Sequence, residues 1–467
     1  MAINREIFRE YDIRGLEETD LRPDVVALLG RVLADYFREA GKTRVLIGRD
    51  IRLSGERIRA NLGSGLIAGG MEVVDIGVVI SPMFYYARVL FDIDAGIMIT
   101  ASHNPGEYNG FKIALGPATI HGEEIQGVLR RMEAAEGTEI PLLSPEEVEA
   151  KVEKRSIWPQ YLQMMRDKIK LGPKPLKVVV DCGNGTASLF AEELFTALGC
   201  EVIPLYCTSD PTFPNHHPDP VRSDNLKELQ ALVTKEGADV GIGFDGDGDR
   251  IGIVDNEGAI VWGDVLMVLY WREILPKYPG ATAIIEVKCS QALVEEVEKL
   301  GGKPFFYRTG HSLIKAKMKE VGAVFTGEMS GHMFFADEYY GFDDAFYAAG
   351  RLLRILSNTD QSMSQLLQDV PKYPSTAESR VECSDRDKFR VVEELRDRMK
   401  AKYEVIDVDG ARVLFPEGWG LVRASNTQPA IVARCEARTQ EALEEITRIM
   451  HDELTSFDAV SDFQWEY

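Results

Sequence analysis

The sequence lacks a hydrophobic run long enough to cross a membrane. Its longest apolar stretches, such as residues 95–100, have the length of a β-strand, and the first residues, MAINRE, are charged where a signal peptide needs an apolar segment. Cysteine is also scarce, with six in 467 residues and no C-x-x-C pair, which argues against a thiolate zinc site and a redox dithiol. We therefore expect a cytoplasmic protein with no membrane partner and with reduced, mostly buried thiols.

Positive charge is in short supply. The chain has 53 Lys and Arg against 75 Asp and Glu, a net charge of −22, so polyanions are repelled and we expect no nucleic-acid partner. An anionic substrate would require basic residues clustered near its site. The hydrophobic share of 45% and the charged share of 27% are ordinary for a globular protein. The length suggests about three compact units.

One pattern of strand, helix, strand, helix, strand and polar loop occurs three times. The strands are residues 44–48, 72–76 and 96–100, then 176–181, 201–205 and 239–244, then 283–287, 303–307 and 322–326. The helices between them start near Ser or Asp residues expected to cap them, at about 54, 81, 188, 224, 290 and 312. This alternation predicts βαβ units with helices on both faces of each sheet. Each third strand leads into a polar loop, where open α/β sheets bind ligands.

After residue 373 the pattern changes to that of a smaller α+β domain. Strands are predicted at 378–382, within 403–415, at 420–424 and at 430–436, with helices at 386–402 and 439–454. Asp409-Gly410 is typical of a hairpin turn. The charged residues 146–155 indicate the end of the first domain and a connecting helix.

The strongest motif is DGDGDR at residues 245–250, between two apolar strands. Asp245, Asp247 and Asp249 alternate with glycines that let the backbone turn tightly, so three carboxylates can converge on one hard cation. Without a cation they would repel one another. An EF-hand is excluded because Arg250 and Asn256 stand where its loop needs Gly and Glu.

A second motif, ASHNP at residues 101–105, follows the third strand of the first repeat. Ser102 has small neighbours and a reachable hydroxyl. A serine hydrolase would need a G-x-S-x-G elbow, which is missing, and we expect the adjacent His103 to be poorly placed to act on Ser102. Taken alone, this loop is equally typical of a structural turn.

Two further loops carry polar side chains suited to a sugar phosphate. In GEMSGH (residues 327–332), Glu328 and Ser330 would point the same way if extended, which suits a pair of sugar hydroxyls; a satisfied polar loop is the alternative. In RASNTQP (residues 423–429), a guanidinium beside Ser, Asn and Thr is typical of a phosphate cradle, with strand or helix capping as the alternative. His216 and His217 are better explained by a rigid Pro-rich loop than by metal binding.

These motifs, in this order, resemble those of the α-D-phosphohexomutase superfamily, most closely its bacterial phosphomannomutase/phosphoglucomutase branch. The resemblance covers essentially the whole chain. It implies a heart-shaped, four-domain α/β architecture of three related mixed α/β domains and a C-terminal α+β domain of the TATA-binding-protein-like type. The domains would span residues 1–153, 154–256, 257–369 and 370–467, carrying in turn the phosphoserine, metal, sugar and phosphate loops.

The resemblance also implies roles for individual residues. Ser102 would be carried as phosphoserine and, with Asp245, Asp247 and Asp249, would hold one Mg²⁺. Arg250 would act at the transferring group, and the general acid/base candidates are Lys112, His311 and His332. The substrate would be bound by Tyr11, Arg14, Lys288, Glu328, Ser330, Arg423, Ser425, Asn426, Thr427 and Arg434.

The implied activity is that of an isomerase, an Mg²⁺-dependent intramolecular phosphotransferase of carbohydrate metabolism. It would interconvert the 1- and 6-phosphates of mannose, glucose or both, with hexose 1,6-bisphosphate as intermediate and activator. GEMSGH resembles the mannose/glucose branch best, but phosphoglucosamine mutase remains an alternative. A catalytically silent sugar-phosphate-binding protein is another. We expect a monomer or a weak homodimer.

Overall fold

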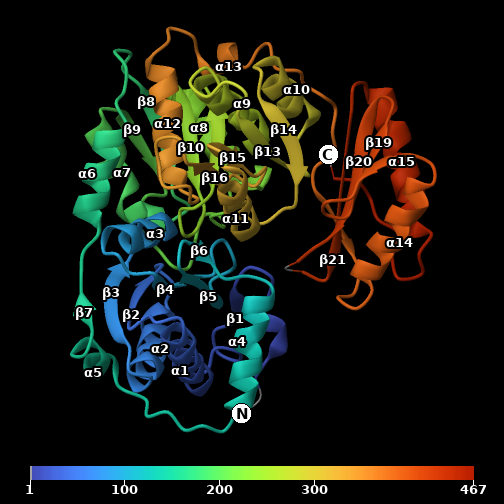
Figure 1. The fold of residues 1–467 in the computed structure, drawn as a ribbon. Helices are drawn as coiled ribbons and strands as arrows, with labels where there is room; N and C mark the ends of the chain where they lie inside the picture. Colours follow the sequence, from blue (N-terminus) through green and yellow to red (C-terminus); the bar gives the residue numbers. More distant parts are fainter. Residues whose placement is uncertain (1–2, 427, 467) are drawn as a thin grey trace. The chain divides into compact units, whose positions relative to one another are not determined.

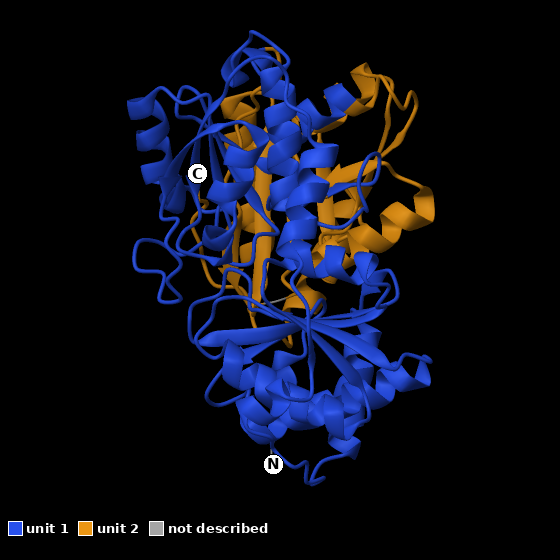
Figure 2. Ribbon diagram, turned by 90° about the vertical axis from the view of Figure 1, so that its left-hand side faces the viewer, with its two compact units in different colours: residues 1–273, 330–368 blue, residues 274–329, 369–467 orange. Residues whose placement is uncertain are grey.

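The computed structural model describes residues 3–426 and 428–466. The chain forms two compact units, unit 1 with residues 1–273 and 330–368 and unit 2 with residues 274–329 and 369–467 (Figure 2). In the described part of the chain, no helix is long and apolar enough to span a bilayer. The cytoplasmic location stays a prediction.

The first sheet of unit 1 is mixed. Its strands, in sheet order, are β1 (Ile13–Leu16), β5 (Tyr108–Leu115), β4 (Ala95–Ile99), β2 (Arg44–Arg49), β3 (Glu72–Val78) and β7 (Glu153–Lys154), with β6 (Ala118–Thr119) paired to β5. The helices are α1 (Pro23–Glu39), α2 (Gly55–Ala68), α3 (Ser81–Leu90) and α4 (Glu123–Ala134), with a 3₁₀ turn η1 (Arg5–Ile7). Helices α1 and α2 pack together on one face and α3 on the other (Figure 1). Leu33, Leu62, Ile97 and Phe111 belong to the buried core.

The second sheet of unit 1 has the order β12 (Ile260–Val261), β11 (Ile251–Asp255), β10 (Val240–Phe244), β8 (Lys177–Asp181) and β9 (Glu201–Leu205). Its repeat helices are α7 (Ala191–Leu198) and α8 (Lys227–Glu236), preceded by 3₁₀ turns η2 (Thr186–Leu189) and η3 (Ser223–Leu226). Unit 1 further contains α5 (Pro145–Glu149), α6 (Trp158–Lys168), α9 (Gly263–Ile274), β16 (Met333–Phe335), α12 (Ala345–Ser357) and α13 (Met363–Leu366).

Unit 2 contains the third repeat and the C-terminal segment. The repeat has the strands β14 (Lys303–Tyr307), β13 (Thr282–Glu286) and β15 (Phe325–Gly327), with α10 (Gln291–Lys299) and α11 (His311–Val321). The C-terminal sheet is antiparallel, in the order β17 (Ser379–Glu382), β21 (Ala430–Ala437), β20 (Gly418–Ala424), β19 (Ala411–Phe415) and β18 (Glu404–Ile406). Helices α14 (Lys388–Lys400) and α15 (Gln440–Thr455) pack on it (Figure 1).

The threefold repeat predicted from the sequence is confirmed. In each copy the first strand is central and pairs in parallel with the second on one side and the third on the other, as in β2 with β3 and β4. The hairpin at Asp409-Gly410 is also confirmed, since Gly410 has a φ of +80° and joins antiparallel strands β18 and β19. The exact domain boundaries at residues 153, 256 and 369 stay predictions.

The predicted capping by serine is only partly correct. Ser290 caps α10 through its side chain. Ser54 precedes α2 without a capping bond, because its hydroxyl instead accepts a 2.9 Å hydrogen bond from the amide of Asn109. Ser81 is the first residue of α3 rather than its cap, and its hydroxyl donates to Asp247 at 2.6 Å. The hydroxyls of Ser54 and Ser81, which the local sequence predicts to cap helices, instead form hydrogen bonds with residues distant in sequence.

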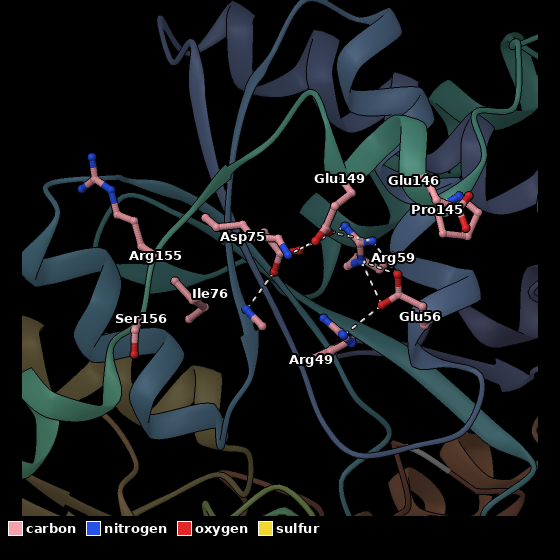
Figure 3. A pocket seen from close by; sticks show the side chains of 12 residues that line it. Arg49, Glu56, Arg59, Asp75, Ile76, Pro145, Glu146, Glu149, Arg155 and Ser156 are labelled. Carbon is pink, nitrogen blue, oxygen red and sulfur yellow. Dashed lines mark hydrogen bonds and ion pairs between the residues drawn. The ribbon is translucent and has the colours of Figure 1, made fainter.

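A hollow of about 600 Å³ in unit 1 is lined by an ion-pair network (Figure 3). At its centre, Arg59 on α2 is 3% exposed and pairs with Asp75 of β3 at 3.1 Å and with Glu149 of α5 at 3.5 Å. Glu56 links Arg59 to Arg49 at the end of β2. All of these charges have partners in the network. We therefore interpret the ion-pair network around the hollow as structural, because it attaches α5 to the first sheet.

We predict that Arg59→Met destabilises unit 1 by about 3 to 5 kcal/mol, because it leaves the buried Asp75 carboxylate without its cation. Thermal and urea unfolding measure the change. The matched control is Arg31→Met, which removes an exposed i,i+4 pair with Asp35 and should cost less than about 1 kcal/mol. Equal losses in the two variants would contradict the network's importance.

Candidate functional site

The loop that carries Ser102 begins where β4 ends. Ser102 is 2% exposed and has a φ of +51°, a left-handed conformation that is unusual for a residue with a side chain. Its backbone N–H donates to the hydroxyl of Thr100 at 2.9 Å, and its own hydroxyl donates to Asp245 Oδ2 at 2.8 Å. These bonds hold the Ser102 hydroxyl against the acidic loop.

Arg52 holds the Ser102 loop in place through hydrogen bonds, and none of the sequence motifs indicated Arg52. Its buried guanidinium donates to the backbone carbonyls of Ser102 at 2.8 Å and Asn104 at 2.6 Å, and also to those of Pro105 and Tyr108. Such a cluster of carbonyls, all accepting from one cation, fixes the loop's path. The local sequence gives no signal, because the contact joins segments about 50 residues apart.

The acidic loop after β10 is completely buried. Asp245, Asp247 and Asp249 are each 0% exposed, and their carboxylates can place one oxygen each within 4.8 Å of one another. Lys112 on β5 donates to Asp247 Oδ2 at 2.7 Å and to Asp249 Oδ2 at 2.5 Å. The structure therefore joins the predicted metal residues to Ser102 and Lys112.

Burial and mutual charge set the pKa values of this cluster. Burial raises the pKa of Asp245 well above its usual range, and the charges of Asp249 and Asp247 add to that effect. Burial alone would lower the pKa of Lys112, but the carboxylates of Asp247 and Asp249 outweigh it and raise that pKa well above its ordinary value. Lys112 is thus a permanent cation at neutral pH.

The residues fit a divalent metal such as Mg²⁺. Two buried oxygens, Asp247 Oδ1 and Asp249 Oδ1, have no hydrogen-bond partner among the described residues. Unsatisfied buried carboxylate oxygens are costly, and hard cations prefer such oxygen ligands. Gly246 lets the loop lie against Ser102, since a Cβ there would meet the Ser102 carbonyl oxygen at 2.3 Å.

Arg250 and His332 form a pair beside the acidic loop. Arg250 Nε donates to His332 Nε2 at 3.0 Å. Because a guanidinium can only donate, His332 Nε2 accepts and the ring proton lies on Nδ1. That nitrogen is 3.4 Å from Asp343 Oδ2 and 3.7 Å from Asp249 Oδ1. Asp343 is a second residue that sequence reasoning missed.

His103 contacts Ser102, but the Ser102 hydroxyl donates to Asp245, so His103 Nδ1 can only donate to the Ser102 oxygen and His103 is not placed to take the hydroxyl proton. Its Nδ1 is 3.0 Å from the Ser102 hydroxyl oxygen, so a side chain can reach its own neighbour here. Burial lowers the pKa of His103 well below its usual value, with Arg250 and Arg14 adding to the effect, so the ring is neutral.

The N-terminal segment also reaches the Ser102 loop. Arg14 on β1 donates to the Asn104 side chain at 2.9 Å and to the Ala101 carbonyl at 3.3 Å, and its guanidinium is paired with Asp12 at 2.7 Å. Tyr11, just before β1, is buried. The structure therefore places the Arg14 guanidinium against the loop that carries Ser102.

In unit 2, one buried carboxylate joins the loops that follow all three strands of the third repeat. Glu286, the last residue of β13, accepts from the Thr309 hydroxyl at 2.7 Å and from the Met329 backbone N–H at 2.8 Å. Its Oε1 is also 3.3 Å from Lys288 Nζ. Glu286 is 0% exposed, and sequence reasoning missed it.

Lys288 lies just beyond β13, as predicted. Its ammonium group donates to Glu378 at 2.9 Å. Burial raises the pKa of Glu378, but Lys288 and Arg380 together outweigh burial, and the pKa falls to about 2. Burial would lower the pKa of Lys288, yet Glu286 and Glu378 raise it.

The predicted sugar loop is not extended. Glu328, just beyond β15, is buried and accepts from the Gly310 N–H at 2.7 Å, next to His311 at the start of α11. Met329 and Ser330 form a turn, so Glu328 and Ser330 do not alternate along a strand. Ser330 is half-buried and belongs to unit 1.

The predicted phosphate loop follows β20. Arg423 is 6% exposed, and its Nε donates to Asp409 Oδ2 at 2.8 Å, which fixes the plane of the guanidinium. The same carboxylate oxygen accepts from the Thr309 N–H at 3.1 Å, so Asp409 is a further residue that the motifs did not indicate. Ser425 is buried and its hydroxyl accepts from the Gln428 N–H.

Two other predicted residues of this region are described, and one is not. Asn426 follows Ser425 directly and is half-buried. Arg434, on β21, is buried, donates to the Lys288 carbonyl and lies 5.6 Å from the centre of the Trp419 ring. Thr427 lies outside the described residues.

Comparison with known proteins identifies the family. Four domain models of the phosphoglucomutase/phosphomannomutase family match consecutive segments of the chain. These are α/β/α domain I at residues 5–139, α/β/α domain II at 159–258, α/β/α domain III at 262–373 and the C-terminal domain at 378–452. The chain belongs to the phosphoglucomutase/phosphomannomutase family. The predicted resemblance and the four-domain architecture of that family are thereby confirmed.

Individual relatives cover nearly the whole chain. A phosphomannomutase/phosphoglucomutase of Pseudomonas aeruginosa is 44% identical over 97% of this chain and 96% of its own. A probable phosphoglucosamine mutase of Methanopyrus kandleri is 35% identical over 94% and 95%. The crystal structure of a phosphoglucomutase/phosphomannomutase family protein from Burkholderia thailandensis has a TM-score of 0.90 at 40% identity, covering 99% of this chain and 100% of that one.

We predict that Lys112→Met lowers thermal stability, because it removes the cation between Asp247 and Asp249 at a cost of about 3 to 5 kcal/mol. Added Mg²⁺ should raise the melting temperature of this variant more than that of the unaltered protein. Lys388→Met is the control, since Lys388 is a buried lysine paired with Asp385, far along the chain from the acidic loop. A rescue by Mg²⁺ equal in both variants would argue against the metal site.

Proposed function

We propose that this protein is a phosphomannomutase/phosphoglucomutase that interconverts hexose 1-phosphates and hexose 6-phosphates through a phosphorylated Ser102. The observation that carries the proposal is the 2.8 Å bond from the Ser102 hydroxyl to Asp245, inside a buried acidic cluster with two unpartnered oxygens. A structural turn would have no need to bury a hydroxyl against three carboxylates. Phosphoryl transfer requires charge compensation and positioning at just such a group.

Asp245, Asp247, Asp249 and the Ser102 phosphoryl group would hold the metal. Mg²⁺ would neutralise negative charge on the transferring phosphoryl group. The protein's own cations extend this effect. Lys112 would add positive charge at the transferring phosphoryl group, since its ammonium group lies against Asp247 and Asp249. Arg250 supplies a second positive charge and is oriented by His332.

We propose that unit 2 recognises the substrate. Glu328 would accept hydrogen bonds from sugar hydroxyls, with Ser330 from the following turn. Arg423 would bind the phosphate that does not react, with Ser425, Asn426 and Thr427 beside it and with Lys288 and Arg434 as further cations. The support is that Arg423 is held in one orientation by Asp409 and that Lys288 is kept charged by its two carboxylate neighbours.

The proposed cycle has two transfers. Phospho-Ser102 gives its phosphoryl group to the free hydroxyl of a hexose monophosphate, which yields a hexose 1,6-bisphosphate. The bisphosphate turns end for end, and its other phosphate returns to Ser102. In the first transfer a general base takes the sugar hydroxyl proton and the departing Ser102 oxygen takes up a proton; in the second transfer both proton movements are reversed. The general acid/base candidates stay Lys112, His311 and His332. His332 would have to release Arg250 from its Nε2 before it could accept a proton.

Replacing Ser102 tests the covalent step. Ser102→Ala should abolish both the phosphorylation seen by intact-protein mass and nearly all mutase turnover, while the melting temperature stays close to that of the unaltered protein. Ser64→Ala removes another buried serine hydroxyl, on α2, and should keep both properties. Near-normal turnover of Ser102→Ala without added bisphosphate would exclude the phosphoserine mechanism.

The metal requirement has its own test. Asp247→Asn removes one formal charge from the acidic cluster, so we expect loss of Mg²⁺-dependent turnover and of calorimetric Mg²⁺ binding. Chelation of the unaltered protein should have the same effect on turnover. Full activity in either case would contradict a metal held by this loop.

The two substrate loops should respond differently. Arg423→Ala should lower kcat/KM for hexose 1-phosphate and 6-phosphate alike, by about 2 to 4 kcal/mol, because either phosphate occupies the same cradle in successive transfers. Glu328→Ala should change the discrimination among hexoses and leave inhibition by inorganic phosphate nearly unchanged. Retained phosphate inhibition in Arg423→Ala, with its loss in Glu328→Ala, would reverse the two assignments.

A coupled assay with the 1-phosphates of glucose, mannose and glucosamine, a trace of hexose 1,6-bisphosphate and Mg²⁺ decides the substrate. The proposed function requires turnover of glucose or mannose 1-phosphate above that of glucosamine 1-phosphate. The reverse order would favour phosphoglucosamine mutase, the name of one 35% identical relative. Binding without turnover of any substrate would indicate a silent binding protein.

A further inference from the structure

Two cysteine sulfurs touch at the edge of the second sheet of unit 1. Cys182 directly follows β8, and Cys207 lies two residues beyond β9, the strand that pairs with β8 in parallel. Their Sγ atoms are 3.2 Å apart. Both are free thiols, and 25 residues separate them in sequence, so no C-x-x-C spacing announces the pair.

The two thiols differ in access. Cys182 is fully buried, whereas Cys207 is half-buried and is the one cysteine of the six that is not buried. Burial raises the pKa of the Cys182 thiol well above its usual range, and the hydrogen bond with Cys207 adds to that effect. An oxidant from solution therefore meets Cys207 first.

We propose that Cys182 and Cys207 are a redox modification site that takes up low-molecular-weight disulfides and becomes an internal disulfide. The Cys207 thiolate attacks one sulfur of the small disulfide, whose S–S bond breaks and releases one thiolate. The released small thiolate takes the Cys182 proton, and Cys182 then attacks Cys207 Sγ and expels the second small thiolate. Two protein thiols and one small disulfide thus give one protein disulfide and two small thiols, which carry away both protons.

The backbone at Cys182 is connected to the acidic loop by hydrogen bonds, so closing the disulfide would act on a segment that supports that loop. The Sγ atoms must approach from 3.2 Å to about 2.05 Å. The Cys182 carbonyl accepts from the Gly185 N–H at 2.7 Å, and the next residue, Thr186, donates its N–H to the carbonyl of Gly246 at 3.0 Å. Gly246 lies between Asp245 and Asp247. We infer, resting here on the proposed function, that oxidation lowers mutase turnover.

The experiment is exchange with oxidised glutathione, followed by denaturing alkylation, intact mass and peptide mapping of the full chain. We expect two fewer alkylated cysteines, a linked pair of peptides containing Cys182 and Cys207, and full reversal by dithiothreitol. Cys207→Ser should block the reaction, and Cys182→Ser should stop it at a glutathione adduct on Cys207. Cys200→Ser, which removes a buried thiol elsewhere in the same domain, should react as the unaltered protein does.

A stable glutathione adduct in the unaltered protein, or a disulfide to another cysteine, would overturn the proposal. Turnover is measured on the same samples and should fall severalfold on oxidation, recover on reduction, and stay unchanged in oxidant-treated Cys207→Ser. A disulfide formed without loss of turnover would overturn the link to the acidic loop. Mass spectrometry detects the disulfide whether or not the protein has mutase activity. If the proposed function is wrong, the reduced protein will show no mutase turnover.

Discussion

The attraction between Lys112 and the carboxylates of Asp247 and Asp249 is the contact on which the candidate site in unit 1 depends. All of these groups are buried, and three adjacent carboxylates would otherwise repel one another in a medium where charge is poorly screened. The lysine comes from the middle of β5, in the first sheet, and the carboxylates follow β10, in the second. The ion pairs of Lys112 therefore connect the first sheet to the acidic loop of the second sheet.

Other parts of unit 1 are arranged around these charges. The hydroxyl of Ser81, at the start of α3, donates to Asp247, so the positive end of that helix faces a carboxylate. Arg52 gathers the carbonyls of the Ser102 loop, and the left-handed Ser102 is held by bonds on both its backbone and its side chain. The hydroxyls of Ser81 and Ser102 and the guanidinium of Arg52, each costly to bury alone, therefore all have partners.

The sequence pattern predicts those features that depend on neighbouring residues. Alternating apolar strands, the Asp409-Gly410 turn and the acidic DGDGDR loop all carry local signals, and each is found where it was expected. Supporting residues such as Arg52 and Glu286 carry none, because their importance arises from partners that only folding brings near. Even Lys112, which the family resemblance indicated, has its carboxylate partner 135 residues away.

The same reasoning explains the errors. His103 was expected to be poorly placed to act on Ser102, and its ring in fact contacts the Ser102 hydroxyl at 3.0 Å, while the hydroxyl proton is donated to Asp245. Ser54 and Ser81 were expected to cap helices, a local use of a hydroxyl, and were instead bound by Asn109 and Asp247. Helices α9 and α12 lie outside the repeat, so its periodicity did not indicate them.

Glu286 has a consequence for how such an enzyme can change over evolutionary time. A single carboxylate accepts from Thr309 and Met329 and lies beside Lys288, so the loops after three strands share one anchor. Under the proposed function, a substitution that reshapes one of these loops to admit a different sugar would also shift the anchor for the other two. New specificities are therefore more accessible through residues at the loop tips, which leave the anchor in place, than through changes in loop length or path.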